Sequence, residues 1–272
     1  MRGYPRNRLT DRSGMAPPTI KRARSRGYSI SYEDAGAGRA IVLVPGWTMS
    51  AADWRDAGYV DRLATRYRVM NVDPLGNGLS DKPHETSAYR QHDVAADIVA
   101  VLDAEGIARA VIWGYSRGAG LAITAAADFP DRVAGLILGG GGDYTGDTPP
   151  APEQEPPAHL AALLNGDFTP LWERYSFTDD DRRHDLEVND PRTLAAMNLA
   201  AAEFGQSALC HRVTAPALIY VGGEDDPDAD RRTADALGAT YRLLPGLNHL
   251  QEFTEIDQVM PFVLEFLEST SD

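Results

Sequence analysis

The chain has 272 residues, of which 43% are hydrophobic and 24% are charged, a composition typical of globular proteins. This composition excludes a collagen, a disulfide-rich mini-protein and a wholly disordered chain. The single cysteine, Cys210, excludes an intramolecular disulfide and a metal site built on several cysteines. No run of about 18 apolar residues occurs, so we expect no membrane-spanning segment and no membrane partner.

Charge is distributed unevenly along the chain. Residues 1–26 hold eight basic residues and one acidic residue, whereas the remainder holds 18 basic and 39 acidic residues. A body this acidic repels phosphate backbones, so we expect no nucleic-acid partner. We expect residues 1–26 to be a disordered basic extension, or sequence upstream of a true start at Met15, although a basic segment can also contact anionic partners. The segment lacks the apolar core of a secretory signal, and we therefore expect a cytoplasmic protein.

Short apolar runs alternate with segments of helical periodicity over most of the chain. This alternation predicts βαβ units, and hence an α/β fold with a mostly parallel central sheet flanked by helices. The expected strands are 27–34, 41–45, 68–73, 110–113, 133–138, 217–222 and 240–244, and the expected helices are 56–67, 93–107, 118–128, 228–237 and 255–268.

Residues 144–206 break this alternation. The segment opens with five prolines between 149 and 157 and contains no convincing strand. We interpret it as a short helical lid inserted after the sixth strand, with helical pieces at 159–165, 170–175 and 191–204. The α/β core then consists of residues 27–143 and 207–272.

A Gly-x-Ser-x-Gly pattern, Gly114-Tyr115-Ser116-Arg117-Gly118, directly follows an expected strand and begins an expected helix. In this strand–turn–helix context the pattern indicates a tight turn that presents the serine hydroxyl as a nucleophile. The same position would also suit a serine that merely caps the helix.

A serine hydroxyl needs a neighbouring base, and that base needs an orienting carboxylate. The sequence has six histidines, His84, His92, His159, His184, His211 and His249. His249 alone lies in a loop just after a late strand, where sites of α/β proteins gather. The loop after strand 217–222 offers four acids, Glu224, Asp225, Asp226 and Asp228. The resulting order along the chain is serine, acid, histidine.

Two backbone N–H groups should face the negative oxygen that forms when a hydroxyl attacks a carbonyl. We expect one from Arg117, the residue after the nucleophile, and the other from Trp47 in the loop after strand 41–45.

The chain resembles α/β-hydrolase-fold serine hydrolases from about residue 27 to 268. Several motifs agree in order: Pro45-Gly46-Trp47 resembles the oxyanion loop, 73–80 the Asp-x-Arg-Gly-His-Gly-x-Ser segment, 114–118 the nucleophile turn, and 129–133 the usual helix-to-strand passage. The segment 223–227 resembles Gly-x-x-Asp-Pro, and the resemblance thereby selects Asp226 as the triad acid. Some members place this acid after the preceding strand, which here would be Asp143.

Three departures from the family pattern stand out. Pro45 replaces the usual His, and Leu75 and Asn77 replace Arg and His, so we expect altered loop packing with catalysis retained. Arg117 lies where many members carry Met. Its side chain would contact a polar or anionic group of the substrate, or else pair with an acid of the lid.

The expected activity is that of a cofactor-independent serine hydrolase with no metal, acting on a small-molecule ester or lactone through Ser116, Asp226 and His249. The oxyanion hole would use Trp47 and Arg117, and substrate contacts would come from Arg117, Trp172, Tyr175 and Phe177. Carbon–carbon bond hydrolases, amidases, thioesterases and perhydrolases share this machinery, and a non-catalytic binding protein on the same fold is the alternative of another class. The sequence leaves the substrate and the oligomeric state open.

Overall fold

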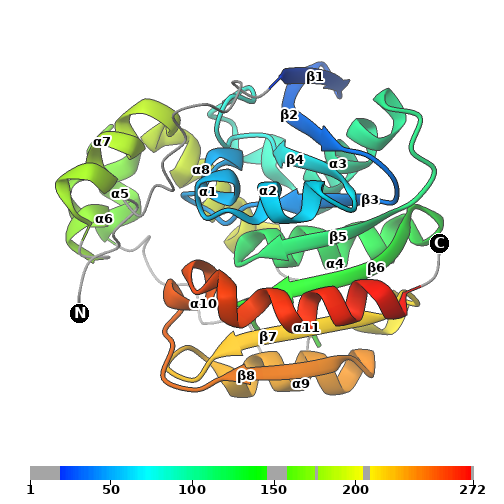
Figure 1. Cartoon of the computed structure of the whole chain (residues 1–272). Helices are drawn as coiled ribbons and strands as arrows, with labels where there is room; N and C mark the ends of the chain where they lie inside the picture. Colours follow the sequence, from blue (N-terminus) through cyan, green and yellow to red (C-terminus); the bar gives the residue numbers. More distant parts are fainter. Residues whose placement is uncertain (1–18, 146–157, 175–176, 205–208, 271–272) are drawn as a thin grey trace.

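Eight strands form one sheet in the order β1-β2-β4-β3-β5-β6-β7-β8 in the computed structural model, which describes residues 19–145, 158–174, 177–204 and 209–270 (Figure 1). Strands β3 to β8 run parallel, whereas β1 and β2 are antiparallel to their neighbours. The strands are β1 (Ile20–Ser25), β2 (Tyr28–Gly36), β3 (Ala40–Val44), β4 (Arg68–Asp73), β5 (Ala110–Tyr115), β6 (Val133–Gly139), β7 (Ala217–Gly222) and β8 (Thr240–Leu244).

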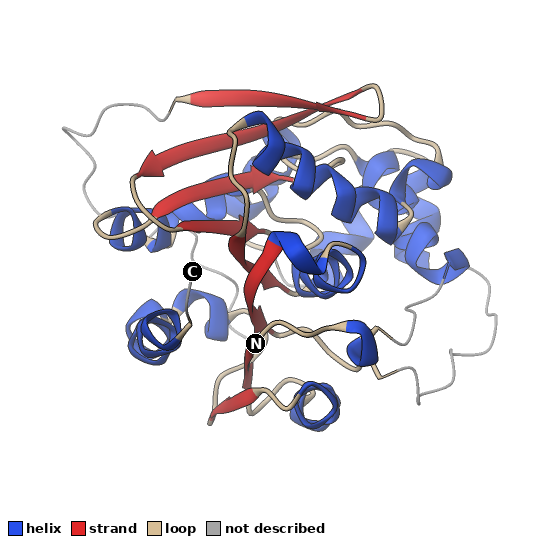
Figure 2. Cartoon of the chain, turned by 90° about the vertical axis from the view of Figure 1, so that its right-hand side faces the viewer, coloured by secondary structure: helices blue, strands red, loops and turns tan. Residues whose placement is uncertain are grey.

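Helices cover both faces of the sheet, and Figure 2 shows how the strand direction changes progressively across it. Alternate residues of each central strand enter separate apolar clusters: Val42 packs in the cluster with α3 and α4, and Leu43 in the cluster with α2 and α11. The helices of the core are α1 (Ala51–Asp56), α2 (Tyr59–Ala64), α3 (Gln91–Ala104), α4 (Arg117–Asp128), α9 (Pro227–Leu237), α10 (Gln251–Thr254) and α11 (Ile256–Ser269).

The central strands are buried throughout, which explains their continuous apolar sequences. Every residue of β3, β5, β6 and β7 is buried. A parallel strand covered by helices on both faces cannot expose alternate side chains to water, so nearly all of them are apolar. The prediction of a mostly parallel α/β sheet is therefore confirmed.

The structure corrects three predicted boundaries. Residues 20–25, assigned to a disordered extension, form strand β1, which pairs with β2 at the sheet edge. The helix expected over 56–67 is the shorter α2 (59–64), and Gly58, whose backbone is left-handed (φ 90°), separates it from α1 (51–56), which was not expected. Strand β5 continues two residues further than expected, to Tyr115.

In the described part of the segment between β6 and β7, four α-helices form a group beside the carboxyl ends of the parallel strands (Figure 1). Two hydrogen bonds attach this group to the loop after β3: the Trp47 indole donates to the Leu194 carbonyl (2.9 Å), and the Asn189 amide donates to the Thr48 carbonyl (2.9 Å). The helices are α5 (Ala158–Leu164), α6 (Thr169–Arg174), α7 (Asp179–Val188) and α8 (Pro191–Phe204), of which α7 was not expected.

Among the helices that the structure describes, none combines the length and the apolar character needed to cross a lipid bilayer.

Candidate active site

Ser116 occupies a strained turn between β5 and α4. Its backbone has φ 54° and ψ −121°, and only one other non-glycine residue in the described part of the chain has a positive φ. Such a conformation costs about 1–3 kcal/mol and persists only where the surroundings impose it. The Ser116 N–H donates to the Gly139 carbonyl at the end of β6 (2.8 Å), which fixes the turn against the neighbouring strand.

The two glycines of the motif are required by close backbone approach. A Cβ on Gly118 would overlap the Val44 carbonyl at the end of β3, and a Cβ on Gly114 would overlap the backbone of Gly118. The helix α4 therefore begins directly against the central strands, and this contact raises Ser116 to the carboxyl edge of the sheet. The structure thus supports the close packing that the Gly-x-Ser-x-Gly pattern predicts.

The loop after β3 packs against Ser116 and is held from below by Asn77. A Cβ on Gly46 would lie 3.3 Å from the Ser116 Cβ. The buried Asn77 amide donates to the carbonyls of Gly46 (3.0 Å), Trp47 (3.2 Å) and Met49 (2.7 Å). Within the described residues, the backbone N–H groups of Trp47 and Arg117 donate no hydrogen bond, so both are available to an acceptor at this edge.

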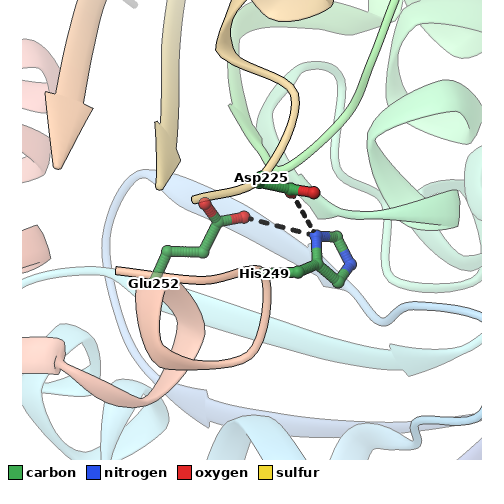
Figure 3. Close-up of side chains that lie close together, drawn as sticks. All are labelled: Asp225, His249 and Glu252. Carbon is green, nitrogen blue, oxygen red and sulfur yellow. Dashed lines mark hydrogen bonds and ion pairs between the residues drawn. The ribbon is translucent and has the colours of Figure 1, made fainter. Parts of the chain in front are cut away.

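His249 lies in the loop after β8 and contacts the same edge. Its Nδ1 is 2.6 Å from an Asp225 carboxylate oxygen, and its other ring nitrogen faces away from the carboxylates (Figure 3). Gly140, which follows the Gly139 partner of Ser116, lies under the imidazole: a Cβ there would be 2.8 Å from His249 Cε1. The structure thus gathers Ser116 and His249 around the end of β6, while no hydrogen bond joins the two among the described residues.

The structure places Asp225, not the expected Asp226, against His249. The Asp226 side chain accepts a hydrogen bond from the Ala229 N–H (3.1 Å) and caps α9, which begins at Pro227. An aspartate directly before a proline at the first helical position is a strong capping signal, and this signal is present in the sequence. The alternative acid, Asp143, forms an ion pair with Arg232 (2.7 Å), whereas the carboxylate bonded to His249 is that of Asp225.

A second carboxyl group, Glu252 of α10, also faces His249 and was not predicted. One of its oxygens is 3.6 Å from His249 Nδ1 and accepts a hydrogen bond from the Tyr115 hydroxyl (3.2 Å), and the other accepts the Gly222 N–H. Its side chain is fully buried. Its spacing, three residues after His249 on a short helix, is the sequence signal that could have found it.

The two groups in contact with the imidazole differ in charge. Burial raises the pKa of Glu252 to about 8, because an uncharged carboxyl tolerates desolvation better than a carboxylate. Burial opposes protonation of His249, but the hydrogen bond and the charge of Asp225 outweigh it and raise the imidazole pKa above its ordinary value. Asp225 is thus the anionic partner of His249, with the buried Glu252 largely neutral near pH 7.

Asp225, His249 and Glu252 are also the group that could hold a metal ion in the described part of the chain, since their ligand atoms lie within 4.8 Å of one another. The donor set is a poor match for a resident metal, because a carboxyl group whose pKa is about 8 must lose its proton before it can coordinate. The prediction of no metal stays a prediction.

The remaining histidines lie in other surroundings. His92 pairs with Asp128 (2.6 Å), and His84 with Asp190 (3.1 Å). His184 lies 3.6 Å from an Asp53 oxygen, and His159 stands edge-on to the Trp47 ring. None of these side chains contacts Ser116 in the described residues.

A cavity of about 170 Å³ lies beside the turn and is lined by Arg117 and Trp47. The expected substrate residues Trp172 and Phe177 do not line it. The Trp172 ring instead stacks on Phe168 (5.4 Å) and its indole donates to Asp185 (3.0 Å), so it packs within the helical group. Tyr175 lies outside the described residues. Helices and loops that the sequence did not link to the site supply the other walls, which include Tyr89, Gln91, Gly120, Leu121, Tyr144, Met197 and Asn198.

Comparison with known proteins agrees with this architecture. Residues 39–188 match the model of the alpha/beta hydrolase fold family. An uncharacterized protein of Mycobacterium tuberculosis is 38% identical over 136 residues, which make up 49% of this chain and 38% of that protein, so the match spans about two fifths of the relative's length. A putative non-heme chloroperoxidase of Synechocystis is 25% identical over 92% of this chain and 99% of its own length.

Among solved structures, an esterase from Rhodococcus sp. ECU1013 superposes with a TM-score of 0.71 at 26% identity, covering 93% of this chain and 99% of the esterase. Structures of epoxide hydrolases and of a meta-cleavage product hydrolase have the same fold, so the fold by itself does not fix the bond that is cleaved. The family model matches more than half of the residues, in the segment that carries β3 to β6 and the Ser116 turn. The chain therefore belongs to the alpha/beta hydrolase fold family.

Proposed function

We propose that the protein is a cofactor-independent serine hydrolase that cleaves a carboxylic ester or lactone through an acyl-enzyme on Ser116. The observation that carries this proposal is the strained Ser116 turn beside a histidine whose Nδ1 is bonded to Asp225. That hydrogen bond fixes the tautomer in which Nε2 is free to accept a proton. A binding protein would have no use for either feature.

The reaction would proceed in two halves. His249 Nε2 takes the hydroxyl proton as Ser116 Oγ attacks the ester carbonyl, and Asp225 stabilises the resulting imidazolium. The N–H groups of Trp47 and Arg117 would donate to the tetrahedral oxyanion. The carbon–oxygen bond to the alcohol then breaks, and His249 returns its proton to the departing oxygen. A water molecule, deprotonated by His249, then attacks the acyl carbonyl, the bond to Ser116 Oγ breaks, and His249 returns the proton to Oγ, which releases the acid and restores Ser116.

Family membership supports hydrolysis in general, and the esterase relative supports this bond in particular. The same acyl-enzyme could serve thioesters, amides or a carbon–carbon bond. Ester cleavage is the proposed reaction because the similar esterase structure supports it, while thioester, amide and carbon–carbon cleavage would use the same residues.

A panel of 4-nitrophenyl esters of increasing acyl length tests the proposal. Ser116→Ala and Ser116→Gly should each lower kcat by roughly 10³-fold or more, since catalysis that survives loss of the nucleophile rests on binding alone. Ser116→Gly removes the hydroxyl and keeps the turn accessible, because glycine adopts a positive φ without strain. A loss of activity in this variant is therefore due to the missing hydroxyl and not to a distorted turn. Ser269→Ala, at the end of α11, is the matched control and should retain full turnover. Equal turnover by both Ser116 variants and the wild type would overturn the proposal.

A further inference from the structure

The Arg117 side chain is a half-buried cation without an anionic partner among the described residues. Within the described residues, its one side-chain hydrogen bond is a long donation to the side-chain oxygen Oδ1 of Asn77 (3.4 Å). A guanidinium has five N–H donors, so most of its donor capacity is unused. Burial lowers the pKa of Arg117 to about 10, and the side chain therefore remains charged at neutral pH. The alternative expectation, that it pairs with an acid of the helical insertion, has no support in the described part of the chain.

The guanidinium lines the cavity of about 170 Å³ beside Ser116. The other walls are mostly apolar or carry polar groups that are already bonded: the Tyr89 hydroxyl donates to Pro83, and the Tyr144 hydroxyl to Gly141. Asn198, on the α8 wall, has no hydrogen bond in the described residues. Counting only partners in the described part of the chain, the cavity thus offers one unpaired cation and one free amide among walls that are apolar or whose polar groups are already bonded.

A buried charge is costly unless it is paired and hydrogen-bonded. A carboxylate suits this site because the planar guanidinium binds two carboxylate oxygens at once. The backbone of Arg117 contributes to the oxyanion hole in the proposed mechanism, while its side chain lines the cavity. The cavity lining includes neither Ser116 nor His249, so an acyl chain held there would have to extend from the Arg117 side chain to the hydroxyl of the preceding residue, Ser116.

We infer that the substrate is an ester whose acyl chain ends in a carboxylate, held by Arg117 with help from Asn198. The acyl part is the better occupant, because it stays bound through both half-reactions whereas the alcohol leaves after the first. A cavity of about 150 Å³ accepts a molecule of benzene's size, so the acyl chain is a short one, that of a dicarboxylic acid of about four to six carbons. This inference rests on the proposed function.

The kinetic test compares two esters of equal chain length, 4-nitrophenyl hydrogen adipate and 4-nitrophenyl hexanoate, each corrected for spontaneous hydrolysis. We expect kcat/KM to favour the adipate half ester by roughly 10²-fold, a typical value for a charge-assisted, bidentate contact. Arg117→Met should abolish this preference and Arg117→Lys should retain part of it. The preference is a ratio within one variant, so it stays readable if the substitution also changes overall turnover. Arg242→Met, on the exposed edge strand β8, should keep the wild-type preference.

A binding test separates this inference from the proposed function. Adipate should bind the Ser116→Gly protein, and Arg117→Met in that background should weaken binding at least tenfold by calorimetry, with hexanamide, which carries no charge, as the neutral comparison. If Ser116→Gly still hydrolyses esters, the proposed function fails while adipate binding continues to decide this inference. Equal affinity with and without the Arg117 guanidinium, or no preference for the half ester, would overturn the inference.

Discussion

Two adjacent carboxylates, Asp225 and Asp226, differ in role because Asp226 caps α9, which begins at Pro227, while Asp225 contacts His249. Asp225 bonds to the imidazole at 2.6 Å, and Asp226 bonds to the backbone N–H of Ala229. Two neighbouring residues of the chain therefore have different roles: Asp225 is the charged partner of the His249 base, and Asp226 is a helix cap.

Substituting each of these residues with alanine should separate the two roles. Asp225→Ala should lower kcat by roughly 10³-fold, because the imidazolium loses its stabilising charge and its fixed tautomer. Asp226→Ala should leave kcat nearly unchanged and lower the free energy of unfolding by about 1 kcal/mol, the usual cost of losing a cap. Ester kinetics and urea denaturation of both variants measure this, and the reverse pattern would restore Asp226 as the acid.

The sequence predicted that one of the four acids in the loop after β7 is the partner of His249, but it did not identify which one. Family resemblance selected Asp226 from the pattern Gly-x-x-Asp-Pro, whereas the capping preference of a residue before Pro227 argued for the neighbour. Both signals were present, and packing of the His249 loop decided between them. Glu252 lies three residues after His249, a spacing visible in the sequence, but its raised pKa depends on complete burial, which one sequence does not reveal.

Buried carboxyl groups near His249 should make stability fall as pH rises. Burial raises the pKa of Glu252 to about 8 and that of Asp230 to about 7, so the folded chain keeps protons that the unfolded chain releases above about pH 4–5. His249, whose pKa is also raised, acts in the same direction, since its charged form stabilises the fold only below its folded pKa. We therefore expect the free energy of unfolding to decrease between pH 5 and pH 8.

The variant Glu252→Gln isolates one of these contributions. It should reduce the decrease in unfolding free energy by an amount on the order of 2 kcal/mol, because the amide does not titrate. The matched control, Glu265→Gln on the exposed face of α11, should keep the wild-type dependence. Urea melts at several pH values measure both, and identical pH profiles for Glu252→Gln and wild type would contradict the assignment.

At the scale of elements, the candidate active site is formed by the loops that follow β3, β4, β5, β7 and β8. Asn77, in the loop after β4, holds the loop after β3 through three carbonyls and also contacts Arg117. The sequence identified this position only as a departure from the family's His. Its function as a brace could not be inferred from one chain, because the three carbonyl partners lie about 30 residues away.

Removing the Asn77 side chain should loosen the oxyanion loop. Asn77→Ala should lower the free energy of unfolding by about 2 kcal/mol, since it leaves buried carbonyl groups without donors, and should reduce kcat by roughly tenfold or more. Asn165→Ala, which removes an exposed amide bonded to Ala161 at the end of α5, is the control and should change neither quantity. An unchanged melting temperature and kcat for Asn77→Ala would show that the loop holds its shape without the brace.

At the scale of the whole molecule, the parallel core was predictable and the antiparallel edge was not. The strands 217–222 and 240–244 were predicted to the residue because each is a short apolar or β-branched run between turn signals. Strand β1 was missed because its sequence, IKRARS, is basic and carries no apolar run. Its place is fixed by pairing with β2 and by Arg26, which forms an ion pair with the fully buried Asp97 (2.7 Å).

Truncation measures what this edge contributes. A chain that begins at residue 27 loses β1 and leaves Asp97 buried without its partner, at a cost of about 3–5 kcal/mol. We expect its melting temperature to fall by roughly 10 °C relative to a chain that begins at residue 19 and keeps both features. Equal melting temperatures for the two truncated chains would show that β1 and the ion pair are dispensable for the fold.

Covalent labelling with a fluorophosphonate, read by intact mass and peptide sequencing, tests the proposed nucleophile most directly. The account predicts one adduct on the Ser116 hydroxyl, loss of ester hydrolysis in step with labelling, and no adduct on Ser116→Gly. Full ester hydrolysis by a protein that stays unlabelled, or an adduct at any other residue with matching loss of activity, would contradict it.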